Sequence, residues 1–227
     1  IIDKTTGKTV SYSRGLIGAL ILSSKFKKYD KGFIGIMIPT SAGCALATAG
    51  ALMSGRIPVM INYSTGAETN ARYAQRKCKF KTIITSKALL EKINCPLIEG
   101  MVLIEDIMAG VTTGDKLKAA LMTKLPTGLI LNSIHKGNED DTAAILFTSG
   151  SEKDPKAVQL SHRNLASNIE SFGSYINITE NDILLANLVF FHIFGLTVNL
   201  WVSLYYGMTM VTYANPLDFQ TISNIAR

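Results

Sequence analysis

Short apolar runs alternate with helical patterns along nearly the whole chain, and this alternation restricts the fold more than any other feature of the sequence. Runs rich in β-branched residues read as strands, and the segments between them place apolar residues at helical spacing. Such an order is typical of βαβ units, in which helices cover a mostly parallel sheet. The sequence therefore predicts an α/β fold with a mostly parallel sheet flanked by helices.

The pattern also assigns residue ranges to these elements. The predicted strands cover residues 33–38, 57–61, 81–86, 100–107, 142–148 and 157–161. The predicted helices cover residues 14–29, 41–54, 67–78, a short segment from Lys87, 115–125 and 162–176. A buried pair, 192–205 and 207–213, follows, and the last residues resemble the start of another helix. Thr40 or Ser41 is expected to cap the second helix, and Ser161 the helix that begins at His162.

Composition excludes several classes of protein. An apolar fraction of 47% and a charged fraction of 18% indicate a folded globule. The net charge of +6 is spread along the chain, so we expect no nucleic-acid partner. The three cysteines and three histidines lie too far apart in sequence to suggest a metal site or a disulfide framework.

Two uncharged segments, residues 33–53 and 186–213, are long enough to span a membrane. Pro39 interrupts the first, and His192, two asparagines and two glycines interrupt the second. We therefore expect buried elements of a soluble α/β protein. The first residues lack the order of a signal peptide, so a cytoplasmic location is expected, with attachment to the periphery of the inner membrane left open for a longer protein.

The stretch FTSGSEKDPKA carries the most specific chemistry in the chain. A predicted strand delivers Thr148 to its carboxyl end, where ligands bind in open α/β sheets. Glycine and hydroxyl residues can turn successive backbone N–H groups inward around an anion, and a lysine supplies a mobile charge. The stretch is not a Walker A loop, because Pro155 and Ala157 flank Lys156 and a strand is predicted to follow. The alternative is a surface hairpin in which serine and glycine only make turns.

Three stretches resemble the adenylate-forming enzymes. FTSGSEKDPKAVQLSHRNL is similar to their nucleotide-binding signature, GFIGIMIPTSAGCALATAGALMSGRIPVMIN to their early strand–helix–strand, and LVFFHIFGLT to a later segment around a histidine. The stretch from Arg56 to Lys92 looks most like acyl-acyl-carrier-protein synthetases, including those fused to a 2-acylglycerophosphoethanolamine acyltransferase.

The resemblance implies a function for the longer protein. Such an enzyme uses ATP and Mg²⁺ to convert a fatty acid into an acyl-adenylate and passes the acyl group to acyl-carrier protein. The alternatives are transfer to coenzyme A, or a non-catalytic relative that senses nucleotide or lipid. A lysophospholipid becomes a further partner if an acyltransferase is fused to the enzyme.

The resemblance also implies the site residues. The phosphates of ATP would be held by a group of residues around the loop: Thr148, Ser149, Gly150, Ser151, Glu152 and Lys156. His192 and Gly195 would lie at the substrate pocket, although His192 beside several phenylalanines could equally be a buried core histidine. No catalytic residue or metal ligand is assigned within the chain.

The chain departs from the family pattern at three positions. Lys153 and Ala157 replace glycines of the loop, and Val189 stands where proline is frequent. If a replaced glycine needed a positive φ, the side chain would cost on the order of 1 kcal/mol or more. This departure motivates the alternative of a non-catalytic relative.

The resemblance also implies how the chain is divided. Residues 1–227 correspond to the first part of the large amino-terminal domain of such enzymes, with a first α/β subdomain over 1–176 and the start of a second over 177–227. We expect the chain to be an amino-terminal fragment of a protein at least twice as long, and to be inactive alone.

Overall fold

The computed structural model describes residues 1–148 and 154–226. Within them, the larger of two sheets has six strands in the order β6-β5-β3-β4-β7-β8. Every neighbouring pair from β6 to β7 is parallel, and β8 runs antiparallel to β7. The strands are β3 (Gly32–Met37), β4 (Arg56–Met60), β5 (Ile83–Thr85), β6 (Met101–Leu103), β7 (Thr142–Thr148) and β8 (Lys156–Ser161). The α/β prediction with a mostly parallel sheet is confirmed.

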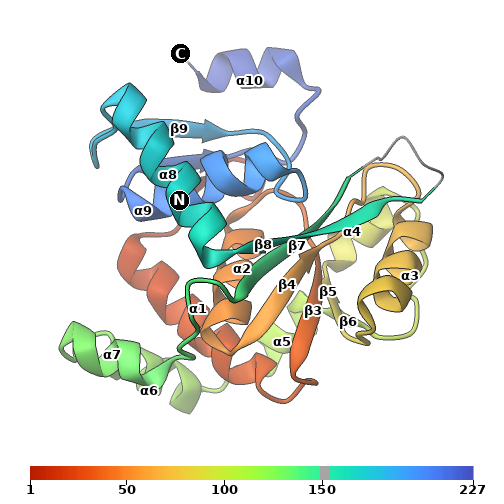
Figure 1. Cartoon of the computed structure of the whole chain (residues 1–227), viewed down its shortest axis with the longest axis horizontal. Coiled ribbons are helices and arrows are strands. Elements are labelled where there is room, and N and C mark those ends of the chain that lie inside the picture. Colours follow the sequence, from red (N-terminus) through yellow and green to blue (C-terminus); the bar gives the residue numbers. More distant parts are fainter. Residues whose placement is uncertain (149–153, 227) are drawn as a thin grey trace.

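Crossover helices join the parallel strands and cover the sheet (Figure 1). They are α2 (Ala42–Met53), α3 (Ala67–Cys78) and α4 (Lys87–Lys92). The Ser41 side chain accepts a hydrogen bond from the backbone N–H of Cys44 at 3.1 Å, which confirms Ser41 as the cap of α2. Residues 33–53 are therefore a strand and a helix of the core.

A second, four-stranded sheet has the order β2-β1-β10-β9 within the described residues. It combines β1 (Ile2–Asp3) and β2 (Lys8–Thr9) with β9 (Ile183–Ala186) and β10 (Thr209–Thr212). The first strand of the chain thus pairs in parallel with β10, some 200 residues later. The proposed division at residue 176 remains a prediction, and the second sheet includes residues on both sides of it.

The core lies between the two sheets and the helices that separate them. Helix α1 (Tyr12–Phe26) packs along α2, and Gly50 of α2 allows this approach because a Cβ there would lie 2.9 Å from the Cβ of Leu22. Phe26, Ile34 and Ile36 join the same cluster as Leu196 and Leu200 from the later part of the chain. One continuous core therefore connects both sheets.

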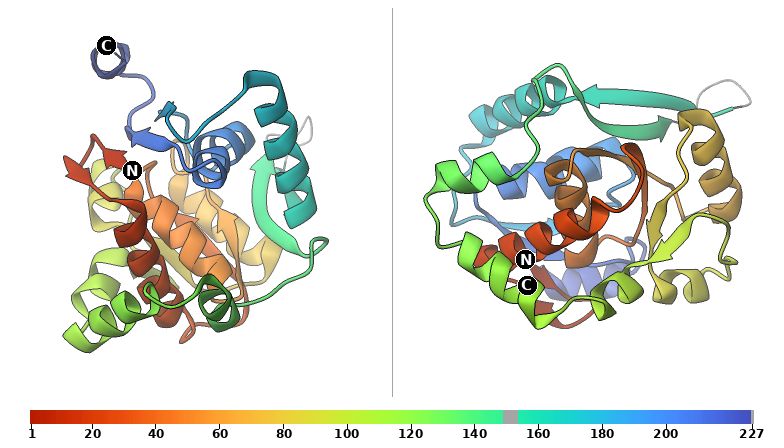
Figure 2. Two further views of the ribbon diagram at one scale, coloured as in Figure 1. Left: turned by 90° about the vertical axis from the view of Figure 1, so that its left-hand side faces the viewer. Right: turned by 90° about the horizontal axis from the view of Figure 1, so that it is seen from below.

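The remaining helices lie around this framework (Figure 2). They are α5 (Ile104–Ala109), α6 (Thr113–Met122), α7 (Thr127–Ser133), α8 (His162–Ile176), a π-helix η1 (Gly195–Val202), α9 (Ser203–Tyr205) and α10 (Phe219–Ile225). Among the described residues, no helix combines the length and hydropathy needed to cross a bilayer.

The structure corrects the strand predicted over residues 100–107. Only Met101–Leu103 pair, at the edge of the sheet, and helix α5 begins at Ile104. Glu105 and Asp106 lie in the first turn of this helix, where acidic side chains interact favourably with its positive end. The sequence analysis also missed α7, β9 and the short strands β1 and β2.

Candidate active site

Three loops gather at one edge of the larger sheet. Strands β3, β4 and β7 are neighbours and parallel, so their carboxyl ends lie together. The segments that leave these ends begin at Ile38, Ile61 and the residue after Thr148. Ligands of open α/β sheets bind at such an edge. This edge is called the carboxyl edge below.

Strand β7 and strand β8 form a hairpin that carries the predicted phosphate loop. Thr148 is exposed at the end of β7 and pairs with Lys156 at the start of β8. The segment after Lys156 is thus a strand, as the exclusion of a Walker A loop required. Ser149, Gly150, Ser151 and Glu152 of the predicted site, together with Lys153, lie outside the described residues.

Tyr73 of helix α3 contacts the hairpin on both sides of its loop. Its hydroxyl donates a hydrogen bond of 2.8 Å to the carbonyl oxygen of Pro155. Its ring packs edge-on against Phe147, with 5.8 Å between the ring centroids. These two contacts fix the residue before Lys156 and the residue before Thr148 relative to the sheet.

Ala157 shows what happens at one of the positions where the family has glycine. It lies within β8 opposite Phe147 and packs against the core cluster that contains Ile145. Among the described residues other than glycine, those with positive φ are Lys79, Asn94 and Asn177, so Ala157 has an ordinary negative φ. The side chain at this position therefore causes no backbone strain. The other replaced glycine, at Lys153, lies outside the described residues.

The loop before His192 is held against the carboxyl edge. The hydroxyl of Thr40, which follows β3, donates to the carbonyl oxygen of Leu188 at 3.3 Å. Asn199 donates to the same carbonyl at 3.2 Å. Tyr63, which follows β4, packs edge-on against Phe191 with 4.9 Å between the ring centroids. The tertiary structure thus brings the His192 loop to the edge that ends in Thr148.

The His192 side chain itself is exposed, so the alternative of a buried core histidine is wrong. Its Nδ1 accepts a hydrogen bond of 3.3 Å from the backbone N–H of Phe194. Its backbone N–H donates to the carbonyl oxygen of Val189 at 3.1 Å. The imidazole is therefore oriented by its own loop and open to a ligand.

Gly195 has a packing role. A Cβ on this residue would overlap the carbonyl oxygen of Val189. The space beside Gly195 is thus filled by the backbone of the loop that carries His192. The close approach of the Val189 carbonyl explains why glycine is needed at this position. Gly195 packs directly against the backbone of that loop.

An apolar groove of about 580 Å³ lies beside the His192 loop. One wall comes from α8, with Leu165 and Phe172, and the other from Ile193, Phe194 and Val198. This size and lining are those of pockets that take small apolar ligands. A second apolar cavity, of about 240 Å³ between α1 and α2, contains neither hairpin nor His192-loop residues.

Sequence reasoning missed Tyr63. Burial raises the pKa of its hydroxyl to about 12, which keeps the hydroxyl protonated at neutral pH. The hydroxyl is buried beside Thr40, whose polar groups oppose part of this rise in pKa. The position of Tyr63 two residues beyond a predicted strand could have drawn attention to it, because side chains after a parallel strand reach the carboxyl edge.

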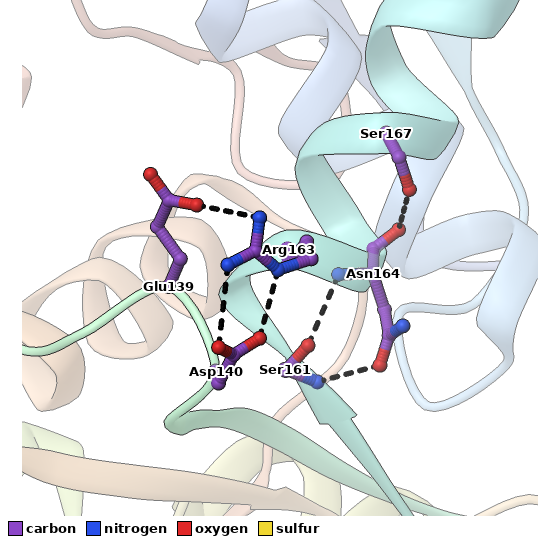
Figure 3. A network of polar contacts seen from close by, with 6 residues as sticks. All are labelled: Glu139, Asp140, Ser161, Arg163, Asn164 and Ser167. Atoms are coloured by element: carbon purple, nitrogen blue, oxygen red, sulfur yellow. Dashed lines mark hydrogen bonds and ion pairs between the residues drawn. The ribbon is translucent and has the colours of Figure 1, made fainter.

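A polar network fixes the opposite end of the hairpin (Figure 3). Arg163 forms ion pairs with Glu139 at 2.8 Å and with Asp140 at 2.8 Å. Ser161 and Asn164 form a reciprocal capping box at the start of α8, which confirms the predicted Ser161 cap. The guanidinium of Arg163 lowers the pKa of Asp140. His162 is the first residue of this helix and lies away from the carboxyl edge. We therefore assign it no role in the chemistry.

The described residues offer limited support for a bound metal. Among residues 1–148 and 154–226, no group of three or more His, Cys, Asp or Glu side chains could hold a metal ion. A Mg²⁺ ion commonly relies on the phosphates of its nucleotide for several of its ligands.

Comparison with known proteins identifies the family. The sequence pattern of the AMP-binding enzyme family matches residues 10–226. The chain is 26% identical over 222 residues to 4-coumarate–CoA ligase 1 of Petroselinum crispum, covering 93% of this chain and 39% of that protein. It is 28% identical over 217 residues to long-chain-fatty-acid–CoA ligase 2 of Schizosaccharomyces pombe, covering 89% and 30%. The chain thus spans well under half the length of these relatives.

The fold agrees with solved structures of the same kind. O-succinylbenzoate coenzyme A synthetase of Bacillus subtilis, in complex with ATP and magnesium ion, superposes with a TM-score of 0.77 at 20% identity. The superposition covers 100% of this chain and 56% of that chain. The fold is therefore that of the amino-terminal part of adenylate-forming enzymes. From its match over residues 10–226, the chain belongs to the AMP-binding enzyme family.

Proposed function

We propose that this chain supplies the amino-terminal part of an acid–thiol ligase that adenylates a carboxylic acid with ATP and Mg²⁺. The observation that carries the proposal is the family match together with the position of the Thr148–Lys156 hairpin at the carboxyl edge. Bound Mg-ATP would supply the adenylyl group and pyrophosphate as the leaving group. The hydroxyl of Thr148 and the charge of Lys156 would bind the phosphates and stabilise their charge.

The apolar groove supports an apolar acid as the substrate. Ile193 and Phe194 follow His192 directly and line the groove, so an acyl chain lying there would place its carboxyl group near the imidazole. A fatty acid or an aryl-substituted acid fits this lining. The role proposed for His192 is to orient the carboxyl group between the groove and the nucleotide.

Coenzyme A is the proposed acceptor thiol. Both curated relatives above are named as CoA ligases, and this supports coenzyme A better than acyl-carrier protein, which the sequence resemblance favoured. The carrier-protein acceptor remains a second candidate because the stretch from Arg56 to Lys92 resembles that branch. A sensing role without catalysis is less favoured, since Ala157 causes no strain in the hairpin.

Binding of Mg-ATP to this chain tests the phosphate site. We expect Lys156→Ala to weaken binding about tenfold or more in isothermal titration, because a charge-assisted contact to phosphate is lost. Lys136→Ala, at an exposed site before the start of β7 and thus at the opposite end of the hairpin from its loop, should bind as the wild type does. Equal affinity of both variants would contradict the proposed site.

A second experiment separates the acceptors. The enzyme that contains this chain is assayed for ATP–pyrophosphate exchange with a fatty acid and then for thioester formation with coenzyme A or acyl-carrier protein. We expect exchange to depend on the acid and coenzyme A to be the better acceptor. Nucleotide binding without any exchange would favour the sensing relative, and robust exchange by this chain alone would contradict the expectation that it is inactive by itself.

A further inference from the structure

Helices α6 and α7 present an apolar surface that the rest of the described structure does not cover. Leu117 and Leu121 of α6 are each 60% exposed, Leu129 and Leu131 of α7 are 53% and 52% exposed, and Leu125 between the helices is 44% exposed. Helix α7 has no buried residue. Leu131 is two positions from Leu129 and so lies on a different side of α7; the other four leucines, at positions 117, 121, 125 and 129, are called the leucine face below. A typical monomer exposes apolar side chains singly, so several exposed leucines on two consecutive short helices indicate an interaction site.

The leucine face is separate from the contacts that attach these helices. Ala119, Met122 and Ile134 pack against Leu20 and Ile21 of helix α1. Leu117 and Leu121 are one helical turn apart and so share a face of α6 that is different from the face of Ala119. Helix α6 is thus apolar on two sides, and only the side of Ala119 packs against α1.

Every charged residue from position 116 to position 136 is a lysine. Residues 116–136 contain Lys116, Lys118, Lys124 and Lys136 and no Asp or Glu. All four lysines are exposed. Of the acids that flank this stretch, Asp115 is paired with Lys25 of α1 at 2.7 Å, and Glu139 and Asp140 are paired with Arg163. Lysines beside exposed leucines on short helices are the pattern of segments that lie in the interface of an anionic bilayer.

From this pattern we infer that the leucine face docks onto the surface of a membrane that contains anionic lipid. The leucines would enter the boundary between headgroups and acyl chains, and the lysines would contact lipid phosphates. Two copies of this chain are a poorer match, because joining two such faces would bring lysines of the same charge together. Lysine is also depleted from the centres of protein interfaces.

The position of the leucine face is compatible with a working site at the carboxyl edge. In Figure 1, helix α7 lies at the left edge of the molecule, whereas strands β7 and β8 run toward its right-hand side. A chain lying on a membrane through α6 and α7 would leave the hairpin in solvent. The inference concerns where the protein acts and does not depend on the proposed reaction.

Sedimentation with lipid vesicles tests the inference on this chain. We expect binding to vesicles of equimolar phosphatidylglycerol and phosphatidylcholine, little binding to phosphatidylcholine alone, and weaker binding as salt screens the lysines. The variant L117S/L121S/L129S should lose binding about tenfold or more, because burial of leucine is the main apolar contribution. The matched control L97S/L217S removes leucines that are 61% and 75% exposed elsewhere and should bind as the wild type does.

Three outcomes would overturn the inference. The first is no binding of the wild type to anionic vesicles, and the second is equal loss of binding in the two leucine variants. The third is self-association in analytical ultracentrifugation that L117S/L121S/L129S abolishes, which would assign the face to a second copy. Circular dichroism of each variant ensures that a loss of binding is not a loss of the fold.

Discussion

Only glycine fits at position 195, because two backbone segments lie very close together there. Its Cα lies so close to the carbonyl oxygen of Val189 that a Cβ would overlap that atom. We expect Gly195→Ala to lower the free energy of unfolding by about 3 kcal/mol or more, since backbone atoms cannot give way as side chains do. Urea unfolding measures this change. Gly43→Ala in α2, where the nearest atom is 3.7 Å away, should be neutral or slightly stabilising. Similar effects at the two positions would contradict the packing role.

The ionisation of Asp115 makes the stability of the fold depend on pH in the acid range. A hydrogen bond from Lys25 and further bonds from Thr112 lower its pKa from 3.8 to about 2. Because the folded state binds this proton less tightly than the unfolded chain does, the contribution to stability is present above pH 3.8 and is lost as the pH falls toward 2. Asp115→Asn should therefore be less stable than the wild type near neutral pH. The difference should shrink across that acid interval in urea unfolding, and a difference independent of pH would contradict this assignment.

At the scale of elements, the β7–β8 hairpin depends on helix α3 for its position. A side-chain hydrogen bond to the exit of the loop comes from Tyr73, which donates to the carbonyl oxygen of Pro155. We expect Tyr73→Phe to weaken Mg-ATP binding by roughly twofold to tenfold, since one hydrogen bond is worth about 0.5–1.5 kcal/mol. The ring and its contact with Phe147 remain, so the fold should be intact. Titration calorimetry measures the affinity.

The control for this prediction is Tyr205→Phe. Tyr205 lies in α9 and is 58% exposed, so loss of its hydroxyl should leave the affinity for Mg-ATP unchanged. If Tyr73→Phe also binds Mg-ATP with wild-type affinity, α3 does not position the phosphate loop.

At the scale of the whole molecule, Asp3 connects the two sheets. It lies in β1 of the smaller sheet and is 2% exposed. One carboxylate oxygen accepts hydrogen bonds from the N–H groups of Thr5 and Thr6, and the other accepts a bond of 3.0 Å from Ala42 at the start of α2. The carboxylate thus also interacts with the positive end of a helix of the larger sheet.

Asp3→Ala should accordingly destabilise the whole molecule. The buried N–H of Ala42 would lose its partner, and we expect a loss of about 2–3 kcal/mol in the free energy of unfolding. Urea unfolding followed by fluorescence of Trp201, which packs against the core that joins the sheets, measures this loss. Asp30→Ala, at an exposed loop position, should change the stability by less than about 0.5 kcal/mol. A loss no larger than that of the control would show that Asp3 does not join the sheets.

Features that depend on interactions between residues close in sequence could be predicted, and contacts between residues far apart in sequence could not. Periodicity and capping act within a few residues, so the sequence by itself determined the alternation of strands and helices, the caps at Ser41 and Ser161, and the strand that ends at Thr148. A helix with acids in its first turn, α5, was misread as a strand, because its apolar run has no period that separates the two.

Only the tertiary structure decided which distant segments meet. The pairing of β1 with β10, the contact of Tyr63 with Phe191 and the bond from Tyr73 to Pro155 join residues far apart in sequence. No local pattern encodes such contacts, since they depend on how several elements pack at once. The same is true of the leucine face, because the sequence predicts an amphipathic helix but cannot say that a second apolar side stays uncovered.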